Sequence, residues 1–288
     1  MAKSDQSADT TCALKLSPEV YDRLAKFITS ELGIKMPATK VSLIQSRLVR
    51  RVRELGLSSI DEYEEYLFGP GGSEERECFF NAITTNKTDF FREPEHFRYL
   101  TEVALPSMQQ SSEYDPDRTR LWSAACSSGE EPYTLAMVLS EYARLHAGFD
   151  FSILGTDIST KVLQKARQGI YTKEQVAPVT RAMRQRYLLQ SRQPDDGLVR
   201  IIPALRQKLS CHKMNFMAHG YRIQDRFDII FLRNVLIYFD KPTQEMVVNR
   251  VCRHLKRGGY LFVSHAESLS DLEIPVRRVH TSVYRQPL

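Results

Sequence analysis

The most constraining feature of the sequence is a regular alternation, from residue 120 onward, of short apolar segments with longer amphipathic ones. Short apolar segments of this kind are typical of buried strands, and the longer ones have helical spacing. The expected strands are residues 120–125, 151–156, 209–214, 227–232 and 260–264, and the expected helices are 131–146, 159–169 and 241–255, the last ended by Gly258 and Gly259. This order predicts an α/β fold with a doubly wound, mostly parallel sheet. A final strand pair around residues 278–285 is expected to be antiparallel.

Two segments interrupt the alternation. A polar stretch covers residues 171–193, and the turn Pro194-Asp195-Asp196-Gly197 separates Leu188-Leu189 from residues 198–202. Because Asp-Gly between apolar runs is a strong hairpin signal, we expect a small antiparallel β insertion near residues 188–213. Within it, we expect residues 198–202 to lie with 205–213 and to expose a sheet edge.

The chain before residue 90 predicts only helices, and therefore a small all-helical N-terminal domain. Ser17 followed by Pro18 is typical of a helix start. Further helices are expected at residues 40–55, 59–69 and from residue 73, with Ser59 and Ser73 as N-caps. We therefore expect a disordered N-terminus at 1–16, a helical domain with its linker at 17–90, and the sheet domain at 91–288.

The second expected helix has a strongly basic face. Residues 35–53 contain six basic residues and no acidic one, and an apolar stripe occupies the other side of the helix. The arginines on or beside the basic face are Arg47, Arg50, Arg51 and Arg53. Such a face suits the docking of an acidic partner, and a merely solvated basic face is the open alternative.

Polar residues follow the first two expected strands, where ligands bind in open parallel sheets. Residues 126–132 form a small-residue loop that enters a helix N-terminus, so free backbone N–H groups can meet a ligand there. Asp157 follows the second strand and is placed to accept hydrogen bonds from two ribose hydroxyls. This pairing alone leaves open that Gly129 is a simple turn and Asp157 a surface helix cap.

The same loop narrows the class of cofactor. It contains no GxGxxG, so the close backbone approach that a pyrophosphate needs is not provided. Glu130 and Glu131 would repel a pyrophosphate but attract the sulfonium and ammonium groups of S-adenosylmethionine. A cofactor with ribose and adenine but without phosphate therefore fits better than NAD or FAD.

Other residue types exclude several classes of site. The five cysteines, Cys12, Cys78, Cys126, Cys211 and Cys252, are scattered without a CxxC pair, so we expect free thiols and no metal site. No segment reaches the roughly 18 uninterrupted apolar residues of a membrane helix. The first residues lack the apolar core of a signal peptide, so we expect a cytoplasmic protein without direct membrane insertion.

Three blocks of sequence carry a family resemblance. Residues 121–137 (LWSAACSSGEEPYTLAM), 83–92 (ITTNKTDFFR) and 231–239 (FLRNVLIYF) closely resemble segments of the chemotaxis receptor glutamate methyltransferases, the CheR family. The resemblance runs from about residue 16 to the end, with the blocks in matching order. It implies a class I, Rossmann-like methyltransferase domain that uses S-adenosylmethionine and releases S-adenosylhomocysteine.

The resemblance also implies roles for individual residues. Those at the methionine end of the cofactor would be Asn86, Thr88 and Arg92, with Glu130 at its charged part, Asp157 at the ribose, Asn215 and Phe216 at the adenine, and Arg233 and Asn234 on the floor of the site. Phe216 as plain core, and Asn86 or Thr88 as helix caps, are alternatives.

The implied reaction is methyl transfer to the side-chain carboxylate of receptor glutamates. A glutamate has an unperturbed pKa near 4.3, so the nucleophile is ionised at neutral pH and needs no general base. We expect Arg98 and Tyr238 to position this carboxylate, by charge-assisted hydrogen bonds and by a hydroxyl respectively. A solvent-facing structural role for Arg98 is the alternative.

The expected partner is the cytoplasmic helical domain of chemotaxis receptors, docked on the arginine face. Whether a receptor C-terminal tail also adds to the β insertion as a strand is left open by the sequence. We expect a monomer. One rival hypothesis is a nucleic-acid methyltransferase, suggested by an isoelectric point near 8.9. No aromatic residues interleave with the basic cluster, which argues against it. The other rival is a noncatalytic receptor-binding adaptor.

Overall fold

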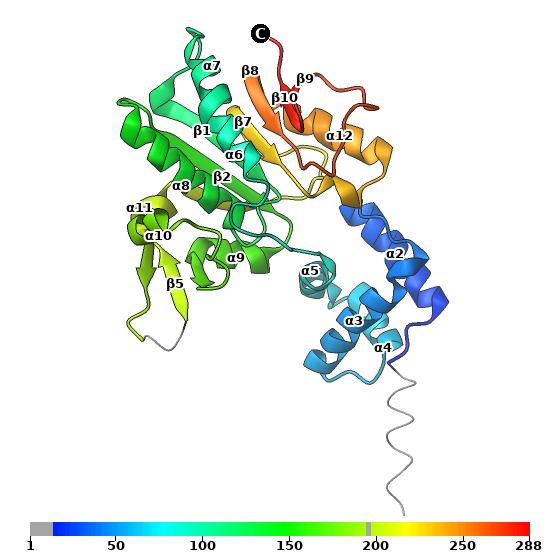
Figure 1. The fold of residues 1–288 in the computed structure, drawn as a ribbon. Coiled ribbons are helices and arrows are strands. Elements are labelled where there is room, and N and C mark those ends of the chain that lie inside the picture. Colours follow the sequence, from blue (N-terminus) through cyan, green and yellow to red (C-terminus); the bar gives the residue numbers. More distant parts are fainter. Residues whose placement is uncertain (1–13, 194–196) are drawn as a thin grey trace, which may run out of the picture. The chain divides into compact units, whose positions relative to one another are not determined.

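A computed structural model describes residues 14–193 and 197–288 (Figure 1). The chain forms two compact units, which divide between Thr85 and Asn86. We call residues up to Thr85 the helical unit and Asn86–Leu288 the sheet unit. Most of the expected disordered N-terminus lies outside the described residues. In the part of the chain that is described, no helix has the length and apolar character required to cross a membrane.

The helical unit contains four α-helices among its described residues. They are α2 (Pro18–Leu32), α3 (Val41–Leu55), α4 (Ile60–Phe68) and α5 (Gly72–Ile83), with a 3-10 turn η1 (Ala38–Lys40) before α3. Ser17 caps α2 by accepting a hydrogen bond from Val20 N, and Ser59 caps α4 through Glu62 N. Leu24, Leu48 and Phe79 are fully buried between the helices. The predicted all-helical N-terminal domain is therefore confirmed.

The predicted N-cap of α5 is wrong. The helix begins at Gly72, and Gly71 rather than Ser73 occupies the cap position, without a side-chain hydrogen bond. A Cβ atom on Gly72 would lie 2.0 Å from the carbonyl oxygen of Leu67. The chain therefore turns into the helix two residues earlier than predicted, and Gly72 lies at a position where only glycine fits.

The sheet unit is built on a seven-stranded sheet with the order β6-β2-β1-β7-β8-β10-β9. Its strands are β1 (Thr119–Ala124), β2 (Phe151–Asp157), β6 (Leu209–Lys213), β7 (Phe227–Leu232), β8 (Leu255–Phe262), β9 (Arg277–His280) and β10 (Val283–Arg285). The five strands from β6 to β8 are parallel, and β10 pairs antiparallel with β8 and β9. The predicted doubly wound, mostly parallel sheet is confirmed.

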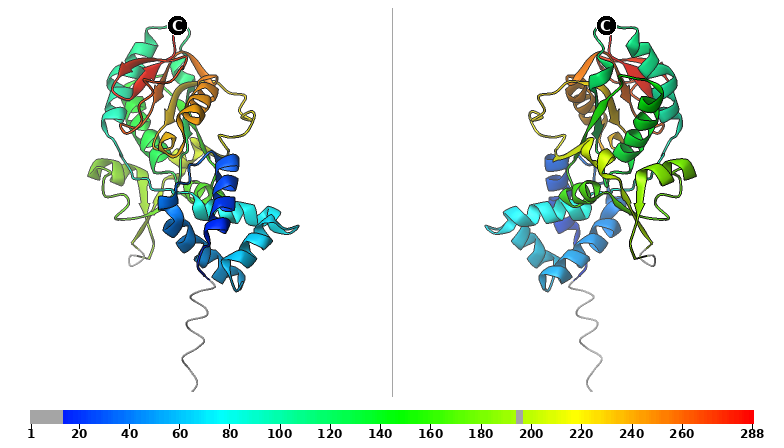
Figure 2. Two further views of the ribbon diagram at one scale, coloured as in Figure 1. Left: turned by 90° about the vertical axis from the view of Figure 1, so that its right-hand side faces the viewer. Right: turned by 90° about the vertical axis from the view of Figure 1, so that its left-hand side faces the viewer.

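Helices cover both faces of this sheet. They are α6 (Glu95–Tyr99), η2 (Leu100–Ala104), α7 (Leu105–Gln109), α8 (Glu130–Leu145), α9 (Thr160–Gln168) and α12 (Lys241–Cys252). Figure 2 shows the sheet between teal and green helices on one side and α12 on the other. On the first side Phe97, Leu135 and Phe231 belong to one buried cluster. This core fixes where the carboxyl ends of the strands lie.

The predicted role of Gly258 and Gly259 is wrong. Helix α12 ends at Cys252, and both glycines lie inside β8. Gly258 has a left-handed φ of 71°, and a Cβ atom on Gly259 would lie 2.7 Å from the carbonyl oxygen of Asp228. Gly259 therefore permits close approach of β8 to β7, and neither glycine ends the helix.

The antiparallel insertion forms its own three-stranded sheet with the order β3-β5-β4. It comprises β3 (Ile170–Thr172), α10 (Arg181–Tyr187), β4 (Leu188–Gln190), β5 (Leu198–Ile201) and α11 (Pro203–Gln207). The pairing of β4 with β5 confirms the predicted small antiparallel insertion. Three residues of the predicted turn, 194–196, lie outside the described part.

The predicted pairing of residues 198–202 with 205–213 is wrong. Pro203 begins α11 directly after Ile202, which ends the extended chain. The following strand, β6, joins the main sheet beside β2, where Cys211 is buried, as the alternation of strands and helices also predicted. Strand β5 is therefore central in the small sheet, and β3 and β4 form its edges.

Candidate active site

The loop after β1 is held in an unusual conformation. Ala125, Ser127 and Gly129 all have positive φ, of 66°, 49° and 100°. A Cβ atom on Gly129 would lie 2.7 Å from the Tyr171 hydroxyl and 2.9 Å from the Ala166 Cβ, so only glycine fits there. The loop enters α8 without a side-chain cap, which leaves backbone N–H groups of the first turn available to a ligand.

Asp157 connects this loop to the end of β2. One carboxylate oxygen accepts a hydrogen bond from Ser127 N at 3.0 Å, and the other accepts one from Ser159 N at 2.9 Å. Burial raises the pKa of the Asp157 carboxyl, whereas these N–H groups favour its ionised form. The side chain is buried, and Ser159 rather than Asp157 caps α9, so the alternative of a surface cap does not describe it.

The two adjacent glutamates of the loop have different partners. Glu131 accepts hydrogen bonds from Ser123 Oγ at 2.7 Å and from Arg233 Nη1 at 2.9 Å. Glu130 is 2% exposed and accepts hydrogen bonds from two neutral side chains, Ser128 Oγ at 2.7 Å and Gln175 Nε2 at 3.3 Å. In the described part of the chain, Glu130 forms no ion pair. Burial raises the pKa of its carboxyl, as expected for a charge without a counter-ion.

Arg233 is the centre of a buried network. Its guanidinium donates to the carbonyl oxygen of Arg92 at 2.6 Å and to the carboxylates of Glu93 at 3.0 Å and Glu131 at 2.9 Å. It also lies over the ring of Phe97, 5.7 Å from the centroid. Arg233 therefore joins the segment before α6 to the start of α8 and to the end of β7.

The turn after β7 is held by a residue that the sequence reasoning missed. One carboxylate oxygen of Glu267 accepts hydrogen bonds from Asn234 N (3.0 Å) and Ser264 N (2.8 Å), and the other accepts from Leu236 N (2.8 Å). These bonds hold Asn234 at a φ of 60° and place the 3-10 turn η5 (Leu236–Tyr238). An acidic residue shortly after the last parallel strand was the available sequence signal.

The segment before α6 contacts the loop after β1. Ser127 Oγ donates to the carbonyl oxygen of Asn86 at 3.0 Å, and Phe91 N donates to Thr134 Oγ1 on α8 at 3.1 Å. Arg92 Nη1 donates to the carbonyl oxygen of Lys87 at 3.2 Å. The structure therefore brings the Asn86–Arg92 segment, with half-buried Thr88, to the same loop as Asp157 and Glu130.

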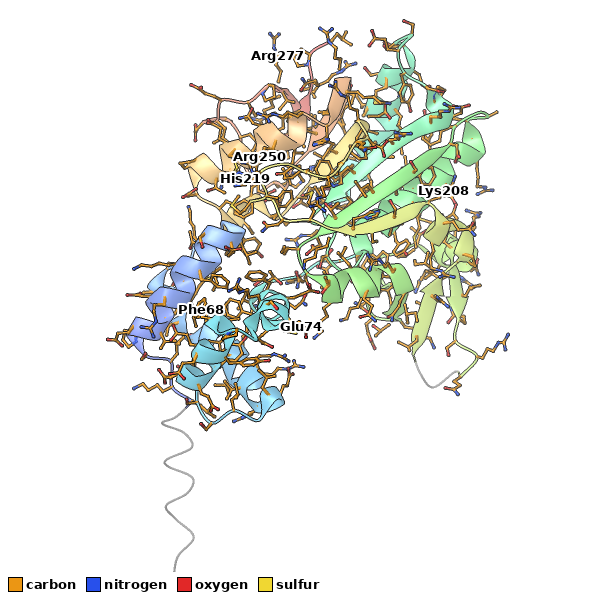
Figure 3. All side chains as sticks on the ribbon, turned by 180° about the vertical axis from the view of Figure 1, so that it is seen from behind. Phe68, Glu74, Lys208, His219, Arg250 and Arg277 are labelled. Carbon is orange, nitrogen blue, oxygen red and sulfur yellow. The ribbon has the colours of Figure 1, made fainter. Side chains whose placement is uncertain are left out.

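The residues expected at the adenine follow β6. Asn215 Oδ1 accepts a hydrogen bond from Met217 N at 2.9 Å, which shapes the turn. Phe216 is buried, with its ring centroid 6.3 Å from that of Phe239. Arg250 on α12, labelled in Figure 3, donates to the carbonyl oxygens of Phe216 and Ala218. An aromatic side chain is thus fixed beyond the end of β6, next to the strand that carries Asp157.

Arg98 and the arginines of α3 are placed differently. Arg98 is exposed on α6, and within the described residues its guanidinium makes no hydrogen bond or ion pair.

In the helical unit, Arg51 donates two hydrogen bonds of 2.7 Å to the buried carboxylate of Glu75 and a further one to Glu54. Arg47 donates to Ile83 O and Thr85 Oγ1, Arg50 pairs with Glu54, and Arg53 is exposed. The four arginines of α3 are therefore not equivalent.

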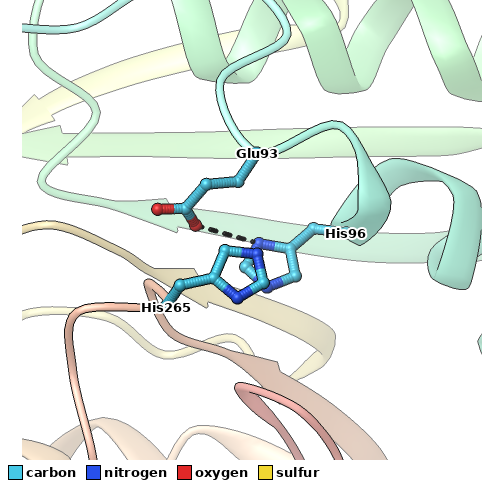
Figure 4. A group of neighbouring side chains, drawn as sticks. All are labelled: Glu93, His96 and His265. Carbon is cyan, nitrogen blue, oxygen red and sulfur yellow. Dashed lines mark ion pairs between the residues drawn. The ribbon is translucent and has the colours of Figure 1, made fainter.

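Glu93, His96 and His265 form a compact group whose possible ligand atoms lie within 4.8 Å of one another (Figure 4). The two imidazole rings stack with centroids 4.8 Å apart and planes inclined by 15°. An imidazole nitrogen binds a metal ion in the plane of its ring, and two nearly parallel planes share no point close to both nitrogens. Glu93 is already bound to Arg233 and Ser264. As placed here, the group packs two rings together rather than forming a coordination site.

Comparison with known proteins agrees with this architecture. Residues 86–285 match the family model described as the CheR methyltransferase SAM binding domain, and residues 19–84 match the CheR methyltransferase all-alpha domain. The chain is 39% identical over 260 residues to the chemotaxis protein methyltransferase of Escherichia coli, covering 90% of this chain and 88% of that protein. It is 38% identical to chemotaxis protein methyltransferase 2 of Pseudomonas aeruginosa, over 88% and 87% of the two chains. From the matches to both domains and to full-length relatives, the chain belongs to the CheR methyltransferase family.

Proposed function

We propose that this protein transfers a methyl group from S-adenosylmethionine to the side-chain carboxylate of glutamates in chemotaxis receptors, giving glutamyl methyl esters. The observation that carries the proposal is the pair of buried carboxylates, Asp157 and Glu130, at adjacent strand ends in a chain of the CheR family. The relatives from Escherichia coli and Pseudomonas aeruginosa are named as chemotaxis protein methyltransferases, which supports the same role here.

The residues at the strand ends fit the cofactor. Asp157 has acceptor capacity left for ribose hydroxyls after its two backbone hydrogen bonds. Glu130 is a buried carboxylate without a cationic partner in the described residues, which suits the ammonium and sulfonium groups. We assign the remaining contacts to Asn86, Thr88 and Arg92 at the methionine end, Asn215 and Phe216 at the adenine, and Arg233 and Asn234 on the floor.

This methyl transfer depends more on the alignment of the two reactants than on acid or base catalysis. The cofactor supplies an electrophilic methyl group, and the substrate carboxylate is already an anion at neutral pH. The protein therefore has to exclude water and hold a carboxylate oxygen in line with the methyl group. Such positioning is worth about 7 to 11 kcal/mol at best.

For the substrate carboxylate we propose Tyr238 and Arg98. The backbone of the η5 turn that carries Tyr238 is held by Glu267 just after β7, which supports a positioning role for this side chain. The exposed guanidinium of Arg98 has no protein partner in the described residues, and is available to an anionic substrate. Arg98→Ala and Tyr238→Phe should each lower kcat without changing the affinity for S-adenosylhomocysteine. An unchanged kcat removes that residue from the assignment.

For docking we propose that the helical region of a receptor contacts α3, with Arg50 and Arg53 contributing most because both are exposed and the ion pair that Arg50 forms with Glu54 is at the surface. Arg47 and Arg51 are tied to groups of their own unit, so they contribute mainly to its structure. A receptor tail would add to β3 or β4, the edges of the small sheet. We propose that the protein acts in the cytoplasm as a monomer, without a metal ion and without a nucleic-acid partner.

The test is a methyl-transfer assay with labelled S-adenosylmethionine and receptor-containing membranes. We expect label in the receptor that mild base releases as methanol, because an ester hydrolyses under conditions that amides survive. Asp157→Asn serves as the inactive control. Base-stable label in nucleic acid would instead indicate a nucleic-acid methyltransferase. Receptor binding without any transfer would indicate an adaptor.

A further inference from the structure

The antiparallel insertion reaches the cofactor loop through β3. The hydroxyl of Tyr171 donates a hydrogen bond to the carbonyl oxygen of Ser128 at 2.8 Å. Its ring packs edge-on against Phe90, with centroids 4.9 Å apart, and is fully buried. The same hydroxyl occupies the space that a side chain at position 129 would need. The insertion is therefore part of the wall that holds the loop Ser128–Glu130.

Gln175, in the turn after β3, is oriented toward this loop. Its Oε1 accepts a hydrogen bond from Thr172 N at 3.0 Å, and Gln175 N donates to Thr172 Oγ1 at 3.2 Å. Because the amide oxygen is engaged by an N–H donor, the amide nitrogen must be at the other end of the group. That nitrogen lies 3.3 Å from Glu130 Oε1. The amide is thus held by its own turn in the orientation that donates to Glu130.

The two donors on Glu130 come from different parts of the chain. Ser128 Oγ binds Oε2 from the cofactor loop, and Gln175 Nε2 binds Oε1 from the insertion. Together they fix the plane of the carboxylate without neutralising its charge. Burial raises the pKa of the Glu130 carboxyl, whereas the hydrogen bond from Ser128 favours its ionised form. A carboxylate prepared in this way suits a cationic ligand group.

We propose that Gln175 is a positioning residue for Glu130, and that the antiparallel insertion thereby sets the affinity of the site for the amino-acid end of S-adenosylmethionine. This inference rests on the proposed function, in which Glu130 binds the charged part of the cofactor. Gln175 lies outside the main sheet, contacts no reacting atom and acts through the side chain of Glu130.

The test compares two ligands that differ only at the amino-acid end. S-adenosylhomocysteine carries the ammonium group, and 5′-methylthioadenosine has the same adenosine and thioether without it. In calorimetric titrations of the full chain, Gln175→Ala should weaken S-adenosylhomocysteine about three- to tenfold, the value of one hydrogen bond, and leave 5′-methylthioadenosine unchanged. Gln185→Ala, an exposed glutamine on α10 of the same insertion, should change neither affinity.

A double-mutant cycle shows whether Gln175 acts through Glu130. In a Glu130→Gln background, Gln175→Ala should have no further effect on S-adenosylhomocysteine. Equal weakening of both ligands by Gln175→Ala would overturn the inference, because it would mean a general loosening of the loop. An unchanged affinity for S-adenosylhomocysteine would overturn it as well.

Different results would contradict the proposed function itself. If Glu130→Gln leaves the affinity for S-adenosylhomocysteine unchanged, or if the unaltered chain does not bind that ligand, the assignment of Glu130 is wrong and the inference falls with it. If Glu130→Gln weakens S-adenosylhomocysteine selectively and Gln175→Ala does not, only the role of Gln175 is wrong.

Discussion

The two units treat their buried charges differently. At the strand ends of the sheet unit, the buried acids Asp157 and Glu130 accept hydrogen bonds from N–H groups, a hydroxyl and an amide, none of which carries a charge. In the helical unit, the buried acid Glu75 is paired with a cation, Arg51 on α3. Among the described residues, neither carboxylate at the strand ends has a cationic partner, which is why we assign both to a ligand. The charge of Arg51 is already used within the fold. Charged residues of one sequence pattern therefore differ in whether the fold itself compensates their charge.

The largest expected effect concerns Asp157. Asp157→Ala should weaken S-adenosylhomocysteine about a thousandfold, because two hydrogen bonds to a charged acceptor are lost together. Calorimetric titration measures the affinity. The fluorescence of Trp122, the single tryptophan and a buried residue of β1, reports whether the sheet unit stays folded. Asp271→Ala, an exposed acid of the same unit, is the control. An unchanged affinity with Asp157→Ala would remove this residue from the site.

The next effect separates arginines that hold the fold from arginines that face solvent. Arg51→Ala leaves the Glu75 carboxylate, 3% exposed, with the Tyr63 hydroxyl and without a counter-ion, and should lower the free energy of unfolding of the helical unit by about 3 kcal/mol. Arg53→Ala should change it by less than about 0.5 kcal/mol. Circular dichroism during urea unfolding measures both, while Trp122 fluorescence follows the sheet unit. Equal effects of the two substitutions on the free energy of unfolding would contradict a structural role for Arg51 that Arg53 lacks.

The next prediction concerns His96, a buried base whose pKa is lowered by burial, whereas burial raises the pKa of the acids Asp157 and Glu130. Burial lowers the pKa of His96 to about 3, against about 6.5 in an unfolded chain. Between these values the unfolded chain binds a proton that the folded chain does not, so the free energy of unfolding falls as the pH falls. From pH 7 to pH 5 the loss is about 2 kcal/mol.

The Glu93 carboxylate lies 3.4 Å from His96 Nδ1 and opposes this lowering of the pKa, but burial outweighs it. His96→Phe should remove this part of the pH dependence, because neither ring nitrogen of His96 has a hydrogen-bond partner among the described residues. Urea unfolding followed by Trp122 fluorescence at the two pH values measures the difference. His219→Phe, at an exposed histidine (Figure 3), should leave the pH dependence unchanged. The same slope in all three proteins would contradict a neutral, buried His96.

The smallest effect concerns docking. Arg50→Glu combined with Arg53→Glu should lower the rate of receptor methylation about fivefold at low salt, with less effect at high salt, and leave the affinity for S-adenosylhomocysteine unchanged. Lys26→Glu with Lys35→Glu makes the same charge change elsewhere on the helical unit and is the control. Equal rates for the two double variants would show that net charge, not the face of α3, attracts the receptor.

The sequence allowed predictions for residues whose structural setting is determined by their immediate neighbours in the chain. The alternation of strands and helices predicted the succession of elements along the sheet unit, and Gly129 and Asp157 were singled out because they lie in the loop after β1 and at the end of β2. Gly258 and Gly259 were misinterpreted because a glycine pair is typical of a helix end as well as of a close approach between strands. Only the position of Asp228 on β7 distinguishes the two.

Residues that act across the fold were not predictable in the same way. Glu267 binds N–H groups of a turn that precedes it by about thirty residues, and Gln175 reaches Glu130 from an insertion. The pairing of Arg51 with Glu75 likewise depends on how α3 and α5 pack. Each of these contacts joins segments that are distant in sequence, so no local pattern specifies it.

The most direct test of the account is the structure of the protein crystallised with S-adenosylhomocysteine. We expect the ribose hydroxyls within hydrogen-bond distance of the Asp157 carboxylate and the ammonium group beside Glu130. A ligand bound elsewhere, or a strand-end crevice filled by protein side chains, would contradict the account.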